Sequence, residues 1–253
     1  PGRQADFVIL DNVTDLNVVD VYHCGKKIIK DEKVEVKPCP PHLKNTVHVS
    51  GFSEERLKLK HPGTKARVIE MLEKQIVTKD VLEEVPWIET DGEKYFSADG
   101  EFQKIAVIER HKNTGKMGVG IVKGYGIRGG AIASSVSHDS HNIIVVGDND
   151  HDMALAVKEM MRTQGGYTLV CNGEIYGTLP LPVMGLMSAA GYESVNEALA
   201  RMIPKAHEMG VKEGFDPFIT LSFMALPVIP EIRITPRGIY LVNEDRMLRT
   251  PFS

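Results

Sequence analysis

Residues 129–146 read GGAIASSVSHDSHNIIVV, in which six consecutive polar residues separate two runs of small and apolar residues. The runs 129–136 and 143–146 have the composition of β-strands, so the sequence predicts two strands joined by the polar segment, residues 137–142. Every polar group that is carried out of water without a partner costs about 1 to 3 kcal/mol. The polar segment is therefore either a solvated surface turn or part of a site, and composition alone leaves both interpretations open.

The polar segment is rich in groups that donate, accept or bind a metal. Its candidate site residues are Ser137, His138, Asp139, Ser140 and His141. In a tight loop the two imidazoles could hold a metal, with the carboxylate between them as a third ligand or as the acceptor that orients one ring. In an extended strand their odd spacing would instead point the rings to opposite faces of the sheet.

A second polar cluster, Glu109-Arg110-His111, ends an apolar run at residues 104–108. Taken alone, it has the composition of a solvated strand end. The sequence also lacks the common catalytic motifs GxSxG, GxxxxGK[ST], HExxH and HxH. No motif of that kind assigns a reaction to either cluster.

Composition and charge narrow the class of protein. The 253 residues are 42% hydrophobic, which is enough for a packed core. The formal net charge is -4 with acids and bases interspersed, so no basic face indicates nucleic acid, and no run of about 18 apolar residues indicates a membrane span. Cys24, Cys39 and Cys171 are isolated, a pattern that favours neither a disulfide framework nor a zinc site. We therefore expect a cytoplasmic globular protein.

The first part of the chain has the pattern of short strands followed by a linker. Apolar runs predict three strands, at residues 7–10, 18–23 and 28–29. Three short strands cannot bury both faces alone, so they belong to a sheet whose other strands lie elsewhere. The prolines of residues 37–41 and the His61-Pro62-Gly63 segment both indicate a boundary. We place it at the second, between residues 1–62 and residues 63–253.

Residues 63–253 mix strand and helix patterns. Strands are predicted at residues 66–72, 75–78, 104–109, 117–122, 143–146 and 167–171, with a hairpin turn at Asn172-Gly173. Apolar residues at helical spacing predict a helix between Asn149 and Gly165, and the strand, helix, strand order predicts a parallel pair. A second helix is predicted to begin at a capping box formed by Ser194 and Glu197.

Several long words of the sequence resemble one family. Residues 1–8, PGRQADFV, are similar to the segment with which chains of the amidohydrolase superfamily leave the catalytic barrel and rejoin a small β-sandwich. Four further words resemble the bacterial adenine deaminases of that superfamily: VIERH at 107–111, SVSHDSHNI at 135–143, LPLPVMGLMS at 179–188 and LPVIP at 226–230. The resemblance extends over essentially the whole chain.

The resemblance implies a fold and an activity for the complete protein. The fold class would be α+β, with β-sandwich strands in residues 1–62 and a C-terminal α/β domain with a mixed sheet in residues 63–253. The activity would be hydrolysis of adenine to hypoxanthine and ammonia by a water that a divalent metal (manganese, iron or zinc) activates. The family's metal ligands lie on a (β/α)8 barrel that precedes the segment resembled by residues 1–8. The resemblance therefore implies no metal on this chain and a barrel half as its partner.

The resemblance also implies a role for the two polar clusters. Glu109, Arg110 and the polar segment would line or close the pocket of the substrate, adenine. A lid with both donors and acceptors suits adenine, whose ring nitrogens accept and whose amino group donates. Because the chain starts at Pro1 without an initiator Met, we expect a segment ahead of it.

Two other classes of function stay open. A non-catalytic module that docks on a separate barrel would have its own start codon just before Pro1, whereas a longer reading frame with an HxH motif would favour the enzyme fragment. A free-standing metal hydrolase using His138, Asp139 and His141 would bind metal stoichiometrically. The sequence fixes neither the metal nor the oligomeric state, for which a homo-oligomer is one option.

Overall fold

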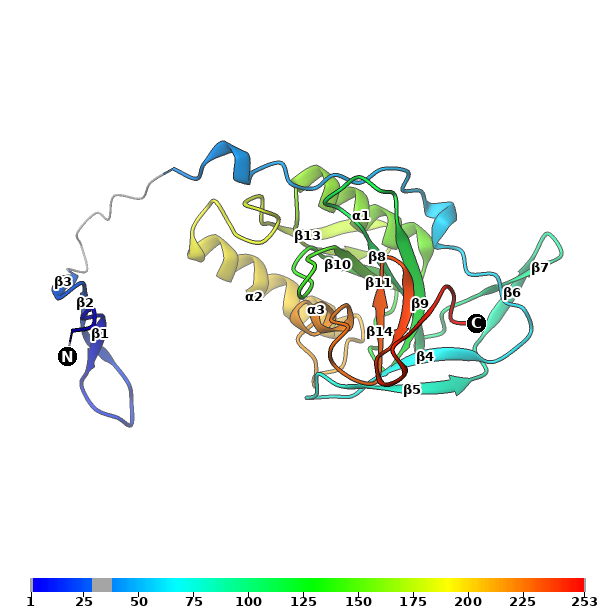
Figure 1. Ribbon diagram of the computed structural model, residues 1–253, viewed down its shortest axis with the longest axis horizontal. Helices are drawn as coiled ribbons and strands as arrows, with labels where there is room; N and C mark the ends of the chain where they lie inside the picture. The colour runs from blue at the N-terminus through cyan, green and yellow to red at the C-terminus, as the bar shows by residue number, and fades with distance from the viewer. Residues whose placement is uncertain (1, 29–37, 253) are drawn as a thin grey trace. The chain divides into compact units, whose positions relative to one another are not determined.

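The computed structural model describes residues 2–28 and 38–252 (Figure 1). The chain divides into two compact units, Pro1–Pro38 and Cys39–Ser253. The boundary placed after residue 62 therefore falls inside the second unit, and the proline-rich segment marks the division. The reason is burial, because Val47, Leu57 and Leu59 belong to the hydrophobic core of the second unit.

The first unit is an antiparallel sheet of three strands, β1 (Phe7–Leu10), β2 (Val18–His23) and β3 (Lys26–Ile28). Strands β1 and β2 match the predicted strands. Strand β3 begins earlier than the strand predicted at 28–29 and shares only Ile28 with it, while Ile29 lies outside the described residues. Val18 and Val19 point to opposite faces of β2 and are each 58% exposed. Both faces of this sheet are thus open, as expected for strands that are part of a larger sheet. A second sandwich layer is absent from the described residues of this unit.

The second unit combines many strands with few helices, which confirms the α+β class. Its strands are β4 (Ala66–Met71), β5 (Thr78–Glu83), β6 (Trp87–Thr90), β7 (Glu93–Phe96), β8 (Phe102–Ile108), β9 (Met117–Lys123), β10 (Gly130–Ser134), β11 (Ile143–Gly147), β12 (Gly166–Cys171), β13 (Glu174–Pro180), β14 (Ile232–Thr235), β15 (Gly238–Leu241) and β16 (Arg246–Leu248). Its helices are α1 (Asp150–Thr163), α2 (Tyr192–Glu208) and α3 (Ile219–Met224), with short 3-10 turns η1 (Pro41–Leu43), η2 (Glu54–Leu57) and η3 (Val242–Glu244). Among the described residues, no helix is both long and apolar enough to cross a membrane.

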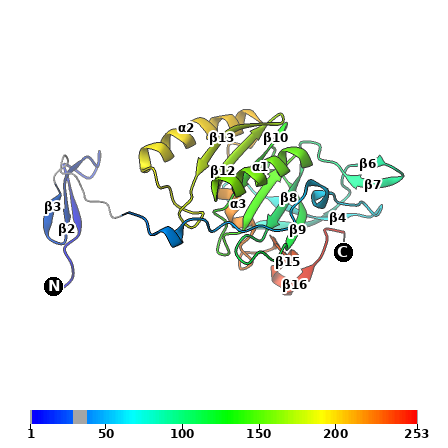
Figure 2. The ribbon, with the colours of Figure 1, turned by 90° about the horizontal axis from the view of Figure 1, so that it is seen from above.

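A mixed eight-stranded sheet organises this unit, in the order β13-β12-β10-β11-β8-β9-β4-β5. Helix α1 covers one face, and α2, α3 and the small sheet β14-β15-β16 cover the other (Figure 2). In β11, Ile143 and Val145 pack on the α1 side, whereas Ile144 and Val146 pack on the opposite side. Because both faces are covered, β10 and β11 are buried along their whole length.

The sheet corrects one predicted connection. Strands β11 and β12 flank α1 in the chain, but β10 lies between them and pairs antiparallel with both. The two strands therefore run in the same direction without being neighbours, and the predicted parallel pair is wrong. Parallel pairing occurs instead between β4 and β9.

Local signals gave mixed results at the ends of elements. Helix α1 begins as predicted, since the Asn149 side chain accepts a hydrogen bond from the Asp152 N–H at 2.8 Å. Helix α2 instead begins at Tyr192 after Gly191, and the Ser194 hydroxyl donates to the Gly191 carbonyl at 3.0 Å. The predicted capping box is therefore wrong. The strand predicted at 75–78 also starts only at its last residue, as β5.

Candidate functional site

The polar segment lies at the end of the sheet where β10 ends and β11 begins. Ser134 of β10 pairs with Tyr167 at the start of β12, and Ile143 pairs with Ile108 at the end of β8. The loop after β8 and the loop after β13 therefore reach the same end of the sheet. Helix α3 joins them, because the His138 N–H donates to the Ser222 carbonyl at 3.1 Å.

Arg110 is the anchor of this region. Its side chain is buried, at 1% exposure, and its guanidinium donates to three backbone carbonyls from distant parts of the chain. The acceptors are those of His141, of Thr46 at 3.2 Å and of Met184 at 3.0 Å. Burial lowers the pKa of Arg110 to about 10, so the group stays charged at neutral pH. Arg110 thus holds the polar segment against the loops that contain Thr46 and Met184. It does not form a solvated strand end.

The loop that receives Arg110 requires a glycine. Gly185 has a φ of +71°, and a Cβ built there would lie 2.8 Å from a terminal guanidinium nitrogen of Arg110. Ser135 donates its hydroxyl to the carbonyl of this same glycine at 2.6 Å. Two of the sequence words at 135–143 and 179–188 are therefore joined by direct contacts.

Glu109 organises the turn that follows β8. Its carboxylate accepts hydrogen bonds from the backbone N–H groups of His111, Lys112 and Thr114, and from the Thr114 hydroxyl. Burial alone would raise the pKa of Glu109, but these hydrogen bonds outweigh it and lower the pKa to about 2. This turn contacts the polar segment, because the His111 Nε2 lies 2.6 Å from the Ser140 carbonyl oxygen.

Replacing Glu109 by Gln is expected to destabilise the protein by about 1 to 2 kcal/mol at pH 7, because a neutral amide oxygen is a weaker acceptor for these donors. The carboxylate has a depressed pKa, so its contribution is present above the unfolded-state pKa of about 4.3 and is lost as pH falls towards 2. The difference between Glu109→Gln and the parent should therefore shrink across that window in urea unfolding. Exposed Glu213→Gln is the control. A difference that does not change with pH would contradict this account.

Glu109 also lines a cavity of about 420 Å³, together with Arg237, Tyr240 and Met247. This cavity lies against the β14–β16 sheet and is lined by that sheet rather than by the polar segment. The structure thus places Glu109 and Arg110 next to the polar segment in the fold, but with different surroundings.

The two histidines of the polar segment lie close together and are partly exposed. The ring centroids of His138 and His141 lie 5.8 Å apart, and His138 stacks on Phe223 of α3 at 5.2 Å. The His138 and Asp139 side chains are 40% and 87% exposed. The segment is therefore a partly exposed loop at the end of the sheet, with Asp139 and Ser140 exposed and its two end residues buried. Phe223 was missed, because nothing in its local sequence indicates contact with a loop about 80 residues earlier.

Two polar atoms of the segment are buried without a hydrogen-bond partner among the described residues, the Ser137 Oγ and the His141 Nδ1. Burial lowers the pKa of His141, and the neighbouring His138 and Arg110 lower it further. The imidazole is therefore neutral at pH 7, with one nitrogen that donates and one that accepts. An ordered water or a group from outside the chain can supply the missing partner, and four other side chains in the described residues have such an atom.

The polar segment does not gather the metal ligands that a free-standing hydrolase would need. Across residues 2–28 and 38–252, a group of three side chains whose ligand atoms all lie within 4.8 Å of one another is found at Asp6, His23 and Cys24, and not at His138, Asp139 and His141. His138 Nδ1 lies 3.7 Å from Asp139 Oδ1, while its ring is stacked on Phe223. The three candidate ligands of the polar segment are therefore not brought together in the described residues.

Fold and site together define an α+β module with a polar loop that carries unpaired groups. The chain belongs to the adenine deaminase C-terminal domain family, whose model matches residues 75–246. The adenine deaminase of Desulfitobacterium hafniense (strain Y51) is 49% identical over 249 residues, which are 98% of this chain and 43% of that protein. Those of Nitratidesulfovibrio vulgaris (strain DP4) and Clostridium acetobutylicum are 43% and 42% identical, over 96% and 98% of this chain and 42% and 44% of the relatives.

These relatives confirm the resemblance that the sequence words indicated. The chain spans less than half the length of the curated relatives it matches.

Proposed function

We propose that this chain is the C-terminal part of an adenine deaminase, and that its polar segment borders the adenine pocket of the complete enzyme. The reaction would be adenine and water to hypoxanthine and ammonia. A divalent metal such as manganese, iron or zinc, bound outside this chain on the catalytic barrel, would activate the attacking water. The proposed compartment is the cytoplasm.

The observation that carries the proposal is the partly exposed pair of histidines on this loop, His138 and His141, whose ring centroids lie 5.8 Å apart. Adenine presents ring nitrogens that accept and an amino group that donates, and a neutral imidazole, which both donates and accepts, can serve both kinds of group. The partly exposed ring of His138, which stacks on the partly buried Phe223, offers a flat face for a purine. Arg110 acts as a positioning residue, since its buried guanidinium binds the His141 carbonyl and so holds the polar segment in place.

The first unit supports the proposal independently. Its three strands leave valine and isoleucine exposed on both faces, which is costly for a free-standing sheet. Further strands supplied by the rest of the enzyme would cover them. The free-standing metal hydrolase has no such support, because the polar segment gathers no set of three ligand atoms.

Substituting His141→Ala in a full-length adenine deaminase that carries this chain is expected to lower kcat/KM at least about tenfold, the low end for a positioned donor or acid-base group. His151→Ala is the matched control, because His151 is an exposed histidine on α1, which follows the opposite end of β11. Steady-state kinetics with adenine and circular dichroism of each variant separate activity from folding. An unchanged kcat/KM for folded His141→Ala would return the polar segment to a surface turn.

A further inference from the structure

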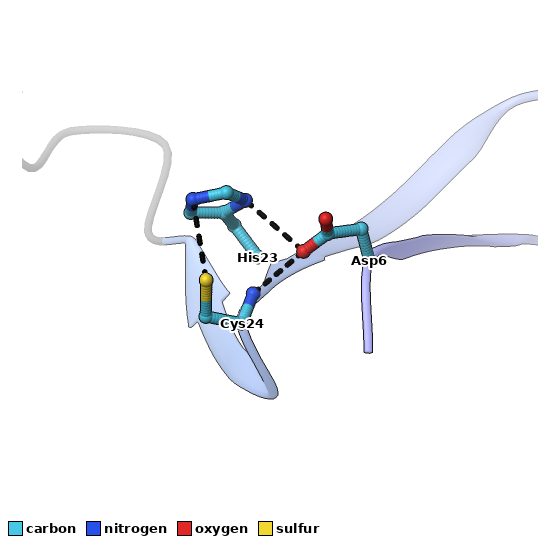
Figure 3. Close-up of side chains that lie close together, drawn as sticks. All are labelled: Asp6, His23 and Cys24. Atoms are coloured by element: carbon cyan, nitrogen blue, oxygen red, sulfur yellow. Dashed lines mark hydrogen bonds and ion pairs between the residues drawn. The ribbon is translucent and has the colours of Figure 1, made fainter. Parts of the chain in front are cut away.

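A second cluster of chemically competent side chains lies in the first unit, away from the polar segment in sequence. Asp6 precedes β1, His23 ends β2 and Cys24 begins the turn into β3 (Figure 3). The Asp6 Oδ1 lies 3.0 Å from His23 Nδ1 and accepts the Cys24 N–H at 2.7 Å. The other ring nitrogen, His23 Nε2, lies 3.5 Å from the Cys24 Sγ. All three side chains are exposed to solvent.

These contacts select one orientation of the imidazole. Because the Asp6 carboxylate can only accept, the proton of the neutral ring sits on Nδ1 and points at Asp6. The lone pair is then on Nε2, which faces the sulfur of Cys24 (Figure 3). A carboxylate that holds the far nitrogen of a histidine is the arrangement that supports metal-binding histidines in proteins.

The spacing of the two free donor atoms matches a zinc coordination edge. Zinc binds histidine nitrogen at about 2.0–2.1 Å and cysteine sulfur at about 2.3 Å. In a tetrahedron those bond lengths separate nitrogen and sulfur by about 3.6 Å. The observed 3.5 Å between His23 Nε2 and Cys24 Sγ is thus the distance that a bound ion needs. Asp6 also maintains this distance, because its carboxylate binds both the His23 ring and the backbone N–H of Cys24.

We propose that His23 and Cys24 bind a zinc-class divalent cation through Nε2 and Sγ, with Asp6 as the carboxylate that orients the ring. The two remaining tetrahedral positions would be filled by water. On binding, the thiol loses its proton to solvent and sulfur donates as thiolate. This site stands apart from the deaminase proposal, because it lies in a different compact unit from the polar segment and shares no residue with it.

The resemblance to the adenine deaminases implies no metal on this chain, whereas His23 and Cys24 offer two ligands for one. Motif rules look for cysteine pairs at short spacing, and Cys24 has no such partner. The cluster forms only because β1 and β2 pair antiparallel, which brings Asp6 beside the end of β2.

Titration of the purified 253-residue chain with Co²⁺ as a zinc substitute tests the proposal. Thiolate ligation gives a sulfur-to-cobalt charge-transfer band in the near ultraviolet, and added Zn²⁺ should abolish it by competition. Cys24→Ser should remove the band. Cys39→Ser and Cys171→Ser, matched controls at the other cysteines, should leave it unchanged.

Two further variants separate a metal site from a plain S–H to nitrogen hydrogen bond. Asp6→Asn retains an oxygen that can accept the Cys24 N–H, and it should weaken Co²⁺ binding about 10- to 100-fold, as loss of an orienting carboxylate does elsewhere. His23→Gln should weaken binding at least as strongly. A band that is absent from the parent chain, or one that survives Cys24→Ser, would overturn the proposal.

Discussion

The 253-residue chain alone is expected to release no ammonia from adenine above background, even with added manganese, iron or zinc. Deamination needs an activated water and a purine pocket held in register, and a metal is what supplies the nucleophile near neutral pH. The polar segment gathers no three-ligand set, and the cluster at Asp6 lies in a different compact unit. Coupled ammonia detection over a range of chain concentrations measures the effect directly.

A full-length adenine deaminase that carries this chain is the positive control for that assay. Addition of a separately expressed catalytic half to the 253-residue chain should restore ammonia release if the two halves dock. Metal-dependent release that rises in proportion to the concentration of this chain alone would overturn the account. It would promote the free-standing hydrolase instead.

Replacement of Arg110 by Met is expected to lower the free energy of unfolding by about 2 to 4 kcal/mol. Three backbone carbonyls would lose their donor, and each hydrogen bond to a charged group contributes about 1.5 to 3 kcal/mol. The cost of burying the guanidinium, visible in its lowered pKa, offsets part of that loss. Arg110→Lys should be nearly as harmful, because one ammonium cannot reach acceptors on three loops in the geometry of a planar guanidinium.

Urea unfolding at pH 7 measures this change, with exposed Arg249→Ala as the control, expected to fall within about 0.5 kcal/mol of the parent. In the full-length enzyme Arg110→Met should also lower kcat/KM, because the polar segment loses its support. Parent-like stability in both Arg110 variants would show that the guanidinium does not hold these loops together.

Local sequence signals predicted those parts of the fold that depend on neighbours in the chain. The apolar run before Asn149 and the cap at that residue gave β11 and α1, and Asn172-Gly173 gave the hairpin of β12 and β13. The parallel pair failed for a different reason. The strand that pairs with β12 is β10, which is far from it in sequence. This choice depends on tertiary packing, including burial on both faces of the sheet. Periodicity carries no information on that choice.

The candidate site shows the same difference between features set by local sequence and features set by distant parts of the chain. Polarity left residues 137–142 as either a solvated turn or part of a site. The structure shows a loop that is exposed at Asp139 and Ser140 and buried at Ser137 and Asn142. In the sequence, Arg110 has the pattern of a solvated strand end. In the structure its guanidinium is buried, and its acceptors are the backbone carbonyls of Thr46, His141 and Met184. Backbone acceptors leave no trace in residue identity, so neither its burial nor its anchoring role could be predicted from the sequence.

The central claim, that the polar segment borders the adenine pocket, is tested most directly by histidine labelling of a full-length enzyme that carries this chain. Diethyl pyrocarbonate modification is followed by mass spectrometry at His138, His141 and His151, with and without saturating adenine. The account predicts that adenine slows modification of His138 and His141 and leaves His151 on α1 unchanged. Equal labelling rates at His138 and His141 in both conditions would contradict it.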